Sequence, residues 1–115
     1  MTNPSKAKGD RAELEVQALL RDELGVGRRA LGAGRKDDIG DITGVRDTCV
    51  QVTNTQDLSG AVTRKLPELE RQMENAGATH GALFCRRRGG KWIVVLTPDM
   101  WFALMREAVE LGAAG

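Results

Sequence analysis

The feature that most constrains the fold is a change of hydrophobic period along the chain. Three segments carry apolar residues at the spacing of an amphipathic helix, and they span Asp10 to Leu24, about Val62 to Ala76, and Met100 to Leu111. Between them lie short runs rich in β-branched residues, bounded by glycine-containing turns. The order helix, strand, hairpin, helix, hairpin, helix predicts a mixed α/β domain with a central sheet flanked by helices.

Two hairpins, over residues 39–53 and 81–96, account for most of the predicted sheet, and a further short strand is expected near 29–31. Pro67 lies inside the apolar stripe of the second helix. Because proline removes a helical hydrogen bond, either the helix kinks there or regular helix begins near Leu66.

The length of 115 residues is that of one domain. We therefore expect residues 1–115 to form a single unit, with a loose basic lead-in at 1–8 and a frayed tail at 111–115. No apolar run approaches the roughly 20 residues that cross a bilayer, and the first residues lack the apolar segment of a signal peptide. Cys49 and Cys85 lie in apolar stretches without metal-binding spacing, which predicts buried, reduced thiols. These features predict a cytoplasmic protein with no membrane partner.

Charge excludes a strongly basic, tail-like nucleic-acid binder, because 17 Lys and Arg residues nearly balance 16 Asp and Glu residues. The basic residues are nevertheless grouped before and in the first helix, in the glycine-rich loop and around the second hairpin turn. The candidate DNA contacts among them are Lys6, Lys8, Arg11, Arg29, Arg35, Lys36, Arg86, Arg87, Arg88 and Lys91. Brought to one side by the sheet, they would follow a phosphate backbone; otherwise they are solvated faces.

The first hairpin is the most informative segment for chemistry. Asp41 lies on one strand, and Gln51 and Thr53 share one face of the next because strand side chains alternate. Glu13 lies at the border of the buried stripe of the first helix. Oxygen ligands that converge at a sheet edge suit Mg²⁺, which takes one or two protein carboxylates and completes its shell with water and phosphate. Taken alone, the pattern is also typical of solvated acids in a turn.

The ordered pattern resembles the PD-(D/E)XK nuclease superfamily and, within it, the small Holliday junction resolvases of archaea and their phage relatives. The similarity runs over roughly Lys6 to Leu104, and its specificity comes from order and spacing. Its pieces are Lys8-Gly9-x-x-x-Glu13, Gly32-Ala-Gly-Arg35, Gly40-Asp41-Ile42-x-Gly44, Val50-Gln51-Val52-Thr53-Asn54, Asn75-Ala76-Gly77 and Arg86-Arg87-Arg88-Gly89. The resemblance implies a restriction-endonuclease-like fold and a Mg²⁺- or Mn²⁺-dependent endonuclease of branched or double-stranded DNA. It also implies a role in DNA recombination in a prokaryotic or phage-infected cell.

In that family an Asp and a Glu on adjacent strands hold the metal, a helix Glu assists, and a Lys two residues after the strand Glu activates the water. Asp41 matches the metal Asp, and Glu13 matches the helix Glu. Gln51 stands at the position of the strand Glu, and Thr53 stands at the position of the Lys. The resemblance therefore implies a metal held by Asp41, Gln51 and the Val52 carbonyl.

These departures leave several hypotheses open. Asp37 or Asp38 compensates for the missing carboxylate, and Lys65 or Lys36 for the missing ammonium, with Lys65 the residue we assign to catalysis. Alternatively, the site is degenerate and the domain binds DNA without cutting it, or the domain has kept only the fold and binds another protein. A shifted register, in which Asp38 rather than Asp41 binds the metal, is also open.

The resemblance further implies a homodimer, because a four-way junction presents two symmetric scissile strands. One small domain offers one active site, so both strands require a second copy of the chain. Trp101, Phe102, Leu104 and Met105 on the last predicted helix are expected either in the core or in a dimer face.

Overall fold

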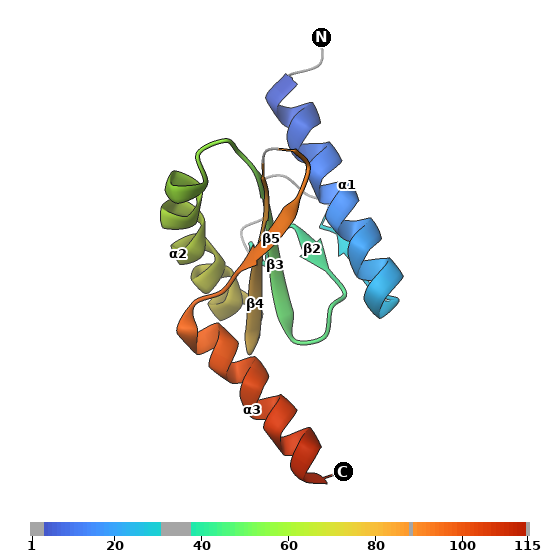
Figure 1. Ribbon diagram of the computed structural model, residues 1–115, viewed down its shortest axis with the longest axis vertical. Helices are drawn as coiled ribbons and strands as arrows, with labels where there is room; N and C mark the ends of the chain where they lie inside the picture. Colours follow the sequence, from blue (N-terminus) through green and yellow to red (C-terminus); the bar gives the residue numbers. More distant parts are fainter. Residues whose placement is uncertain (1–3, 31–37, 88, 115) are drawn as a thin grey trace.

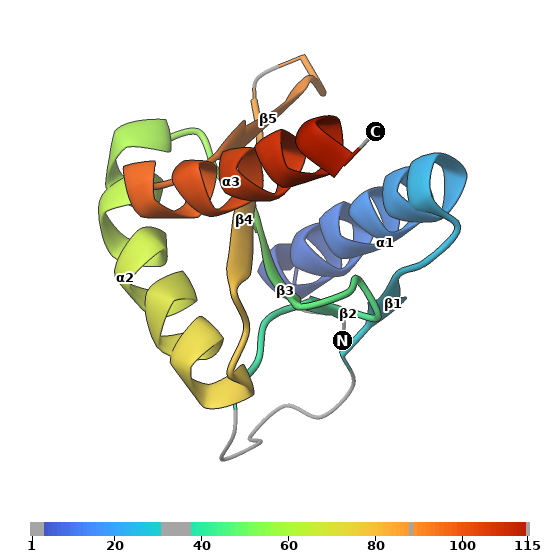
Figure 2. The same cartoon turned by 90° about the horizontal axis from the view of Figure 1, so that it is seen from below.

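A five-stranded mixed sheet carries α1 on one face and α2 and α3 on the other (Figures 1 and 2), in a computed structural model that describes residues 4–30, 38–87 and 89–114. Its elements follow in the order α1 (Pro4–Leu24), β1 (Arg28–Arg29), β2 (Ile42–Thr43), β3 (Thr48–Asn54), α2 (Leu58–Ala76), β4 (His80–Arg86), β5 (Trp92–Val95) and α3 (Pro98–Ala114). The expectation of an α/β fold with a mixed central sheet flanked by helices is confirmed. The narrower likeness to restriction endonucleases stays a prediction.

The strands lie in sequence order across the sheet. Strands β1, β2 and β3 are antiparallel neighbours, and Ile42 pairs with Val50 where β2 meets β3. Strands β3 and β4 are parallel, so α2 must cross over between them, and β5 returns antiparallel to β4. The central β3 therefore has the first hairpin on one side and the crossover strand on the other.

Side-chain alternation along β3 divides the core into two layers. Val50 and Val52 face α1 and pack against Val16 and Leu20. Cys49, on the opposite face, belongs to a second cluster under α2 and α3, with the members Cys49, Leu69, Leu83, Cys85 and Met100. Burial of both faces explains why β3 is buried at four consecutive positions, Cys49–Val52.

All three helices are longer than the sequence predicts, and α3 extends from Pro98 to Ala114, into the tail that was expected to be frayed from residue 111. Helix α1 begins at Pro4, so residues 4–8 are helical where a loose lead-in was expected; proline is well suited to a first helical turn. Helix α2 begins at Leu58 and contains Pro67 in its interior, so it does not begin near Leu66. The Asp57 side chain caps α2 by accepting a hydrogen bond from the Gly60 N–H (3.0 Å).

The sequence also predicts the burial of both cysteines. Cys49 and Cys85 are free and buried, and burial raises the pKa of both thiols, as expected for unreactive core residues. His80 is the first residue of β4 and is buried. Within the described ranges, no helix combines the length and apolar character needed to cross a membrane.

Candidate functional site

Asp41 lies directly before β2, against the backbone of β3. Its N–H donates to the Val50 carbonyl (2.8 Å), and its Oδ2 accepts from the Val52 N–H (2.8 Å). The next residue, Ile42, packs in the layer under α1, so strand alternation directs Asp41 toward the face that α2 covers. Two hydrogen bonds to β3 thus fix the Asp41 carboxyl beside the strand that carries Gln51.

Charged side chains from several elements act on this carboxyl. Burial raises the pKa of Asp41 from 3.8 to about 6. The Val52 N–H lowers that pKa, Glu13 on α1 raises it, Lys65 on α2 lowers it, and Asp38 raises it. A carboxyl perturbed by burial together with specific charged neighbours is typical of functional sites.

Gln51 adds a second buried oxygen. Its side chain is 3% exposed, and its Oε1 has no hydrogen-bond partner among the described residues. Because Cys49 faces α2, Gln51 two residues later faces α2 as well, on the same side as Asp41. The N–H and C=O of one strand residue point to the same neighbour, so the Val52 carbonyl is also directed toward Asp41. The Asp41 carboxyl, the Gln51 amide and the Val52 carbonyl therefore belong to neighbouring positions at this edge of the sheet.

Asp38, the alternative ligand, is engaged by the loop that precedes β2. Its Oδ1 accepts from the Gly40 N–H (3.1 Å), its Oδ2 accepts from Gln72 Nε2 (2.9 Å), and its backbone carbonyl accepts from Asn75 Nδ2 (3.0 Å). Both carboxylate oxygens of Asp38 are thus engaged, Oδ1 within the loop and Oδ2 with α2, whereas the described side-chain hydrogen bond of Asp41 uses Oδ2 alone. This geometry favours Asp41. Asp37 lies outside the described residues.

Gln72 is a site neighbour that sequence reasoning missed. It is 2% exposed, and its Oε1 also lacks a hydrogen-bond partner among the described residues. The signal was present in the sequence, because Gln72 follows Leu69 by three residues and so shares the core-facing stripe of α2. A polar residue at such a position indicates a buried hydrogen-bonding role.

The two helix residues predicted for the site each have an ion-pair partner. Glu13 Oε1 lies 3.3 Å from Arg29 Nε, and Asp10 Oδ1 lies 2.8 Å from Arg29 Nη2. Lys65 Nζ lies 3.4 Å from Glu68 Oε2, one helical turn away. Arg29, predicted as a DNA contact, therefore holds β1 to the acidic face of α1.

A small basic cleft of about 230 Å³ opens just beyond the end of β3. It lies between the first half of α1, the loop after β3 and the turn between β4 and β5. Lys8, Arg86 and Arg87 line it together with polar and glycine residues. The backbone N–H of Arg87 donates to the Lys91 carbonyl (2.7 Å) and closes the turn. Residues from three segments that are far apart in the sequence thus meet here.

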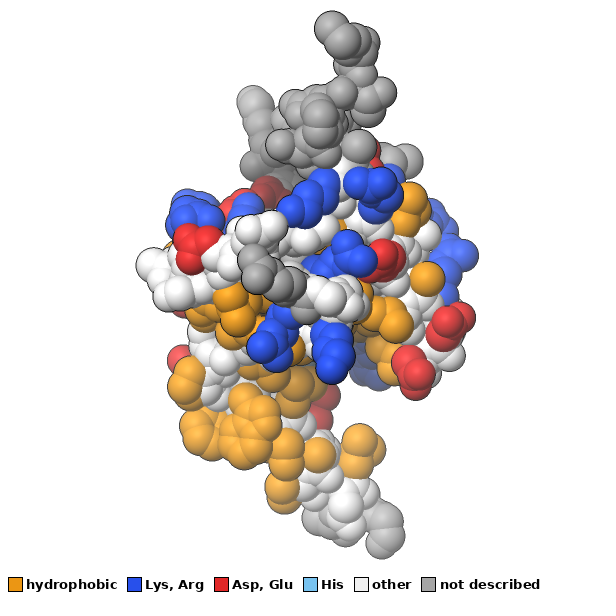
Figure 3. Space-filling view, turned by 45° about the horizontal axis from the view of Figure 1, so that its top comes forward, with side chains coloured by type: hydrophobic (Ala, Val, Ile, Leu, Met, Phe, Trp, Pro, Cys, Tyr) orange, Lys and Arg blue, Asp and Glu red, His pale blue; other side chains and the backbone are white. Residues whose placement is uncertain are grey.

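The remaining predicted DNA contacts are distributed unevenly. Arg11 is exposed on α1, and Lys91 is exposed in the turn. Lys6 lies in α1, but its side chain is outside the described part of the chain, as are Arg35, Lys36 and Arg88. Figure 3 shows Lys and Arg side chains gathered over the upper part of the molecule, whereas hydrophobic side chains cover its lower end.

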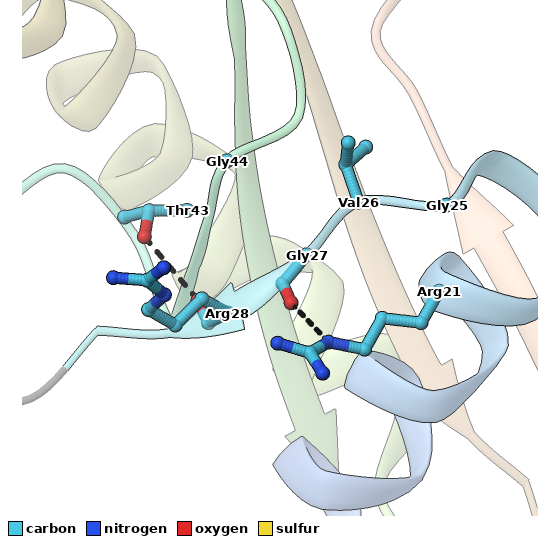
Figure 4. A pocket seen from close by; sticks show the side chains of 7 residues that line it. All are labelled: Arg21, Gly25, Val26, Gly27, Arg28, Thr43 and Gly44. Atoms are coloured by element: carbon cyan, nitrogen blue, oxygen red, sulfur yellow. Dashed lines mark hydrogen bonds between the residues drawn. The ribbon is translucent and has the colours of Figure 1, made fainter.

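A second basic hollow, of about 410 Å³, lies at the other end of α1 (Figure 4). Arg21 and Arg28 line it, and none of the residues that form it is acidic. Arg21 Nε donates to the Gly27 carbonyl (2.8 Å), which holds the guanidinium at the mouth of the hollow. Sequence reasoning did not assign Arg21, because its proximity to Arg28 depends on the turn after α1.

The oxygen atoms of Asp41, Gln51 and Val52 suit a hard divalent cation that takes only a few of its ligands from the protein. No group of three or more His, Cys, Asp or Glu side chains in the described ranges is arranged to hold a metal. Mg²⁺ needs only one or two carboxylates, with water and phosphate as further ligands. The Asp41 carboxylate, the unpartnered Gln51 Oε1 and the Val52 carbonyl meet that requirement with one negative charge.

Comparison of the chain with protein-family models, with curated proteins and with solved structures finds no match.

Proposed function

We propose that this protein is a magnesium-dependent, structure-selective DNA endonuclease of the Holliday junction resolvase type, acting on branched DNA as a homodimer. One observation carries the proposal: the half-buried Asp41 carboxyl is fixed against β3 by the Val52 N–H (2.8 Å), and Glu13 from α1 and Lys65 from α2 are among the charges that shift its pKa. These residues are far apart in sequence; Asp41 and Glu13 are the two that match the resemblance, and Lys65 is the residue that we assign in place of the Lys missing at Thr53. The Gln51 Oε1, which has no hydrogen-bond partner among the described residues, would be a further oxygen ligand for a metal.

In this proposal Asp41, Gln51 and the Val52 carbonyl hold Mg²⁺ or Mn²⁺, which supplies Lewis acidity at the scissile phosphate. Lys65 provides the positive charge that Thr53 lacks, next to the attacking water. Glu13 orients that water from the side of α1. The Val52 N–H holds the Asp41 carboxylate in place through its hydrogen bond to Oδ2.

The basic cleft beyond β3 supports binding of the DNA backbone. Lys8, Arg86 and Arg87 lie around a space close to the C-terminal end of β3, the strand that carries Gln51. Contacts of this kind position a duplex without reading its sequence, which suits a structure-selective enzyme. The hollow lined by Arg21 and Arg28 offers a second phosphate contact at the other end of α1, next to β1 and the end of β2.

The test uses a labelled four-way junction and a linear duplex of the same composition. We expect the wild type to cleave the junction in Mg²⁺, and we expect Asp41→Asn to lose activity by roughly 100-fold or more, a typical effect of losing one charged group at a reacting centre. Asp22→Asn, an exposed acid of α1, is the matched control and should cleave like the wild type. Absence of wild-type cleavage over a range of Mg²⁺ and Mn²⁺ concentrations contradicts the nuclease. Full activity of Asp41→Asn contradicts the site.

A catalytically degenerate DNA-binding domain is the second candidate, and the uncharged pair Gln51 and Thr53 favours it. It predicts junction binding that weakens with salt and does not require metal. The double variant Gln51→Glu with Thr53→Lys should then create metal-dependent cleavage. A domain that kept only the fold and binds protein predicts no affinity for any form of DNA.

A further inference from the structure

Helix α3 exposes a continuous apolar surface on the side that faces away from the sheet. Its core side packs on β4 through Met100 and Ala103, and His80 Nε2 lies 2.8 Å from Glu107 Oε1. The outward residues are large and hydrophobic, with exposed fractions from 39% to 67%: Trp101, Phe102, Met105 and Val109. Leu104 and Leu111 are also exposed but lie beside the core-facing Met100, and Leu111 lines a hollow together with His80 and Glu107. A surface helix normally has one apolar stripe, and α3 has two.

The charges of α3 are confined to one side of the helix. At 100° per residue, Asp99, Arg106 and Glu110 fall within one narrow arc, next to the core-facing Glu107. About half of the helix circumference, from Leu111 through Met105 to Phe102, carries no charged residue. The aromatic rings of Trp101 and Phe102 lie edge to face, with centroids 5.2 Å apart. The uncharged arc and the exposed side chains are therefore the same surface.

The exposed area is large enough to form the centre of an interface. The four outward side chains present roughly 400 Å² of largely apolar surface, a patch of the size that is often functional on monomeric proteins. A standard interface buries about 800 Å² per partner, so this surface supplies about half of one. Figures 1 and 3 show α3 projecting from the body at the end opposite the basic side chains, with hydrophobic side chains along it.

The order of side chains along α3 fits a second copy of the same chain. Trp101 and Val109 lie equally far before and after Met105. If two α3 helices pack antiparallel with Met105 at the two-fold axis, the large Trp101 of each copy lies against the smaller Val109 of the other. Such large-against-small pairing is self-complementary, as an isologous interface requires.

We infer that the outward face of α3 is the homodimer interface, formed by antiparallel packing of two α3 helices about Met105. Only the use of this dimer, one active site for each scissile strand, rests on the proposed function. The interface leaves the Asp41 edge and the basic cleft free, because neither includes a residue of α3.

Sedimentation equilibrium at physiological salt tests the dimer. The wild type should be dimeric at micromolar concentration, and Met105→Glu should be monomeric with unchanged helical circular dichroism, because glutamate is a good helix former. Val94→Glu adds the same charge at a half-exposed position on β5 and should stay dimeric. If Met105→Glu fails to fold, Val109→Glu takes its place, because Val109 is 67% exposed.

A wild type that is monomeric, including one that binds only lipid vesicles or another protein through α3, overturns the inference. So does a Met105→Glu variant as dimeric as the parent. Oxidation of Met105→Cys should give a disulfide-linked dimer, whereas Leu24→Cys, exposed on α1, should not. Cross-linking at Leu24 alone overturns the antiparallel arrangement. A dimer that cuts no DNA contradicts the nuclease and leaves the interface standing, and a monomer that cuts DNA does the reverse.

Discussion

At the scale of single residues, the most consequential feature is the Asp41 carboxyl, whose surroundings disfavour its ionised form. Asp41 is ionised at neutral pH against the cost of burial, and among the described residues the Val52 N–H and Lys65 offset that cost. Gln51, its neighbour, hides an amide oxygen without a described partner. Burying the Asp41 carboxyl and the Gln51 amide oxygen lowers the stability of the fold at this site. Such a loss of stability is common where a site binds a ligand.

The pH dependence of stability follows from the raised pKa of Asp41. Because the folded pKa is about 6 and the ordinary value is 3.8, the folded state binds more protons between these values. The free energy of unfolding should therefore fall by about 2 to 3 kcal/mol as the pH rises through this window. Asp41→Asn keeps an oxygen for the Val52 N–H and should lack this fall. Urea denaturation in EDTA at a series of pH values measures it, and parallel curves for the two proteins would contradict the assignment.

At the scale of elements, the short β2 depends on how closely its entry approaches β3. Gly40 has a φ of 111° and is buried, and a Cβ there would lie 2.8 Å from the Val50 carbonyl oxygen. The chain therefore reaches Asp41 through a conformation and a close approach that only glycine permits. Asp38 holds the same loop to α2 through Gln72. Gly40 and Asp38 thus both fix the position of Asp41, the candidate metal ligand.

Gly40→Ala should lower the free energy of unfolding by about 2 to 4 kcal/mol, because it adds both strain at positive φ and a backbone clash. The matched control is Gly9→Ala in α1, where nothing lies within 4 Å of the added Cβ. That control should gain up to about 1 kcal/mol from helix propensity. Chemical denaturation of both variants measures the difference. Equal stability of the two variants would show that the approach of β2 to β3 is not constrained by Gly40.

At the scale of the whole molecule, charge and hydrophobicity lie at different ends. The basic cleft lies between α1 and the β4–β5 turn, whereas the apolar surface lies along α3 (Figure 3). Although the net charge is only +1, the basic and apolar side chains are unevenly distributed. One face is suited to binding phosphates, and another is suited to binding protein. The separation allows DNA binding and dimer formation at the same time.

The salt dependence of DNA binding should show that the basic cleft, and not α3, binds the phosphate backbone. Replacing Lys8 and Arg87 by Ala should weaken junction binding and reduce the slope of log K against log salt by about 0.9 for each phosphate that the variant no longer neutralises. Arg106→Ala, on the charged side of α3, is the control and should leave the slope unchanged. Fluorescence anisotropy across a salt series measures both quantities. An equal change in all variants would mean that the cleft does not bind the backbone.

The sequence by itself determined which segments form helices and strands, the α/β class and the burial of both cysteines. These properties are local, because the period of apolar residues sets which face of an element leaves water. The start of α1 at Pro4 was not predicted, and the sequence left open whether α2 runs through Pro67 or begins near Leu66; packing against the sheet, which outweighs a local helix breaker, decided for the first.

Only the tertiary structure decided which candidates share a site. It brought Asp38 to Gln72, Arg29 to Glu13, and Lys65 to the surroundings of Asp41. Each of these relations joins elements that are distant in sequence, and a pKa or an ion pair depends on burial and distance, which the order of residues does not specify. The outward face of α3 belongs to the same category, because an apolar helix has the same sequence pattern whether its second face meets the core or another chain.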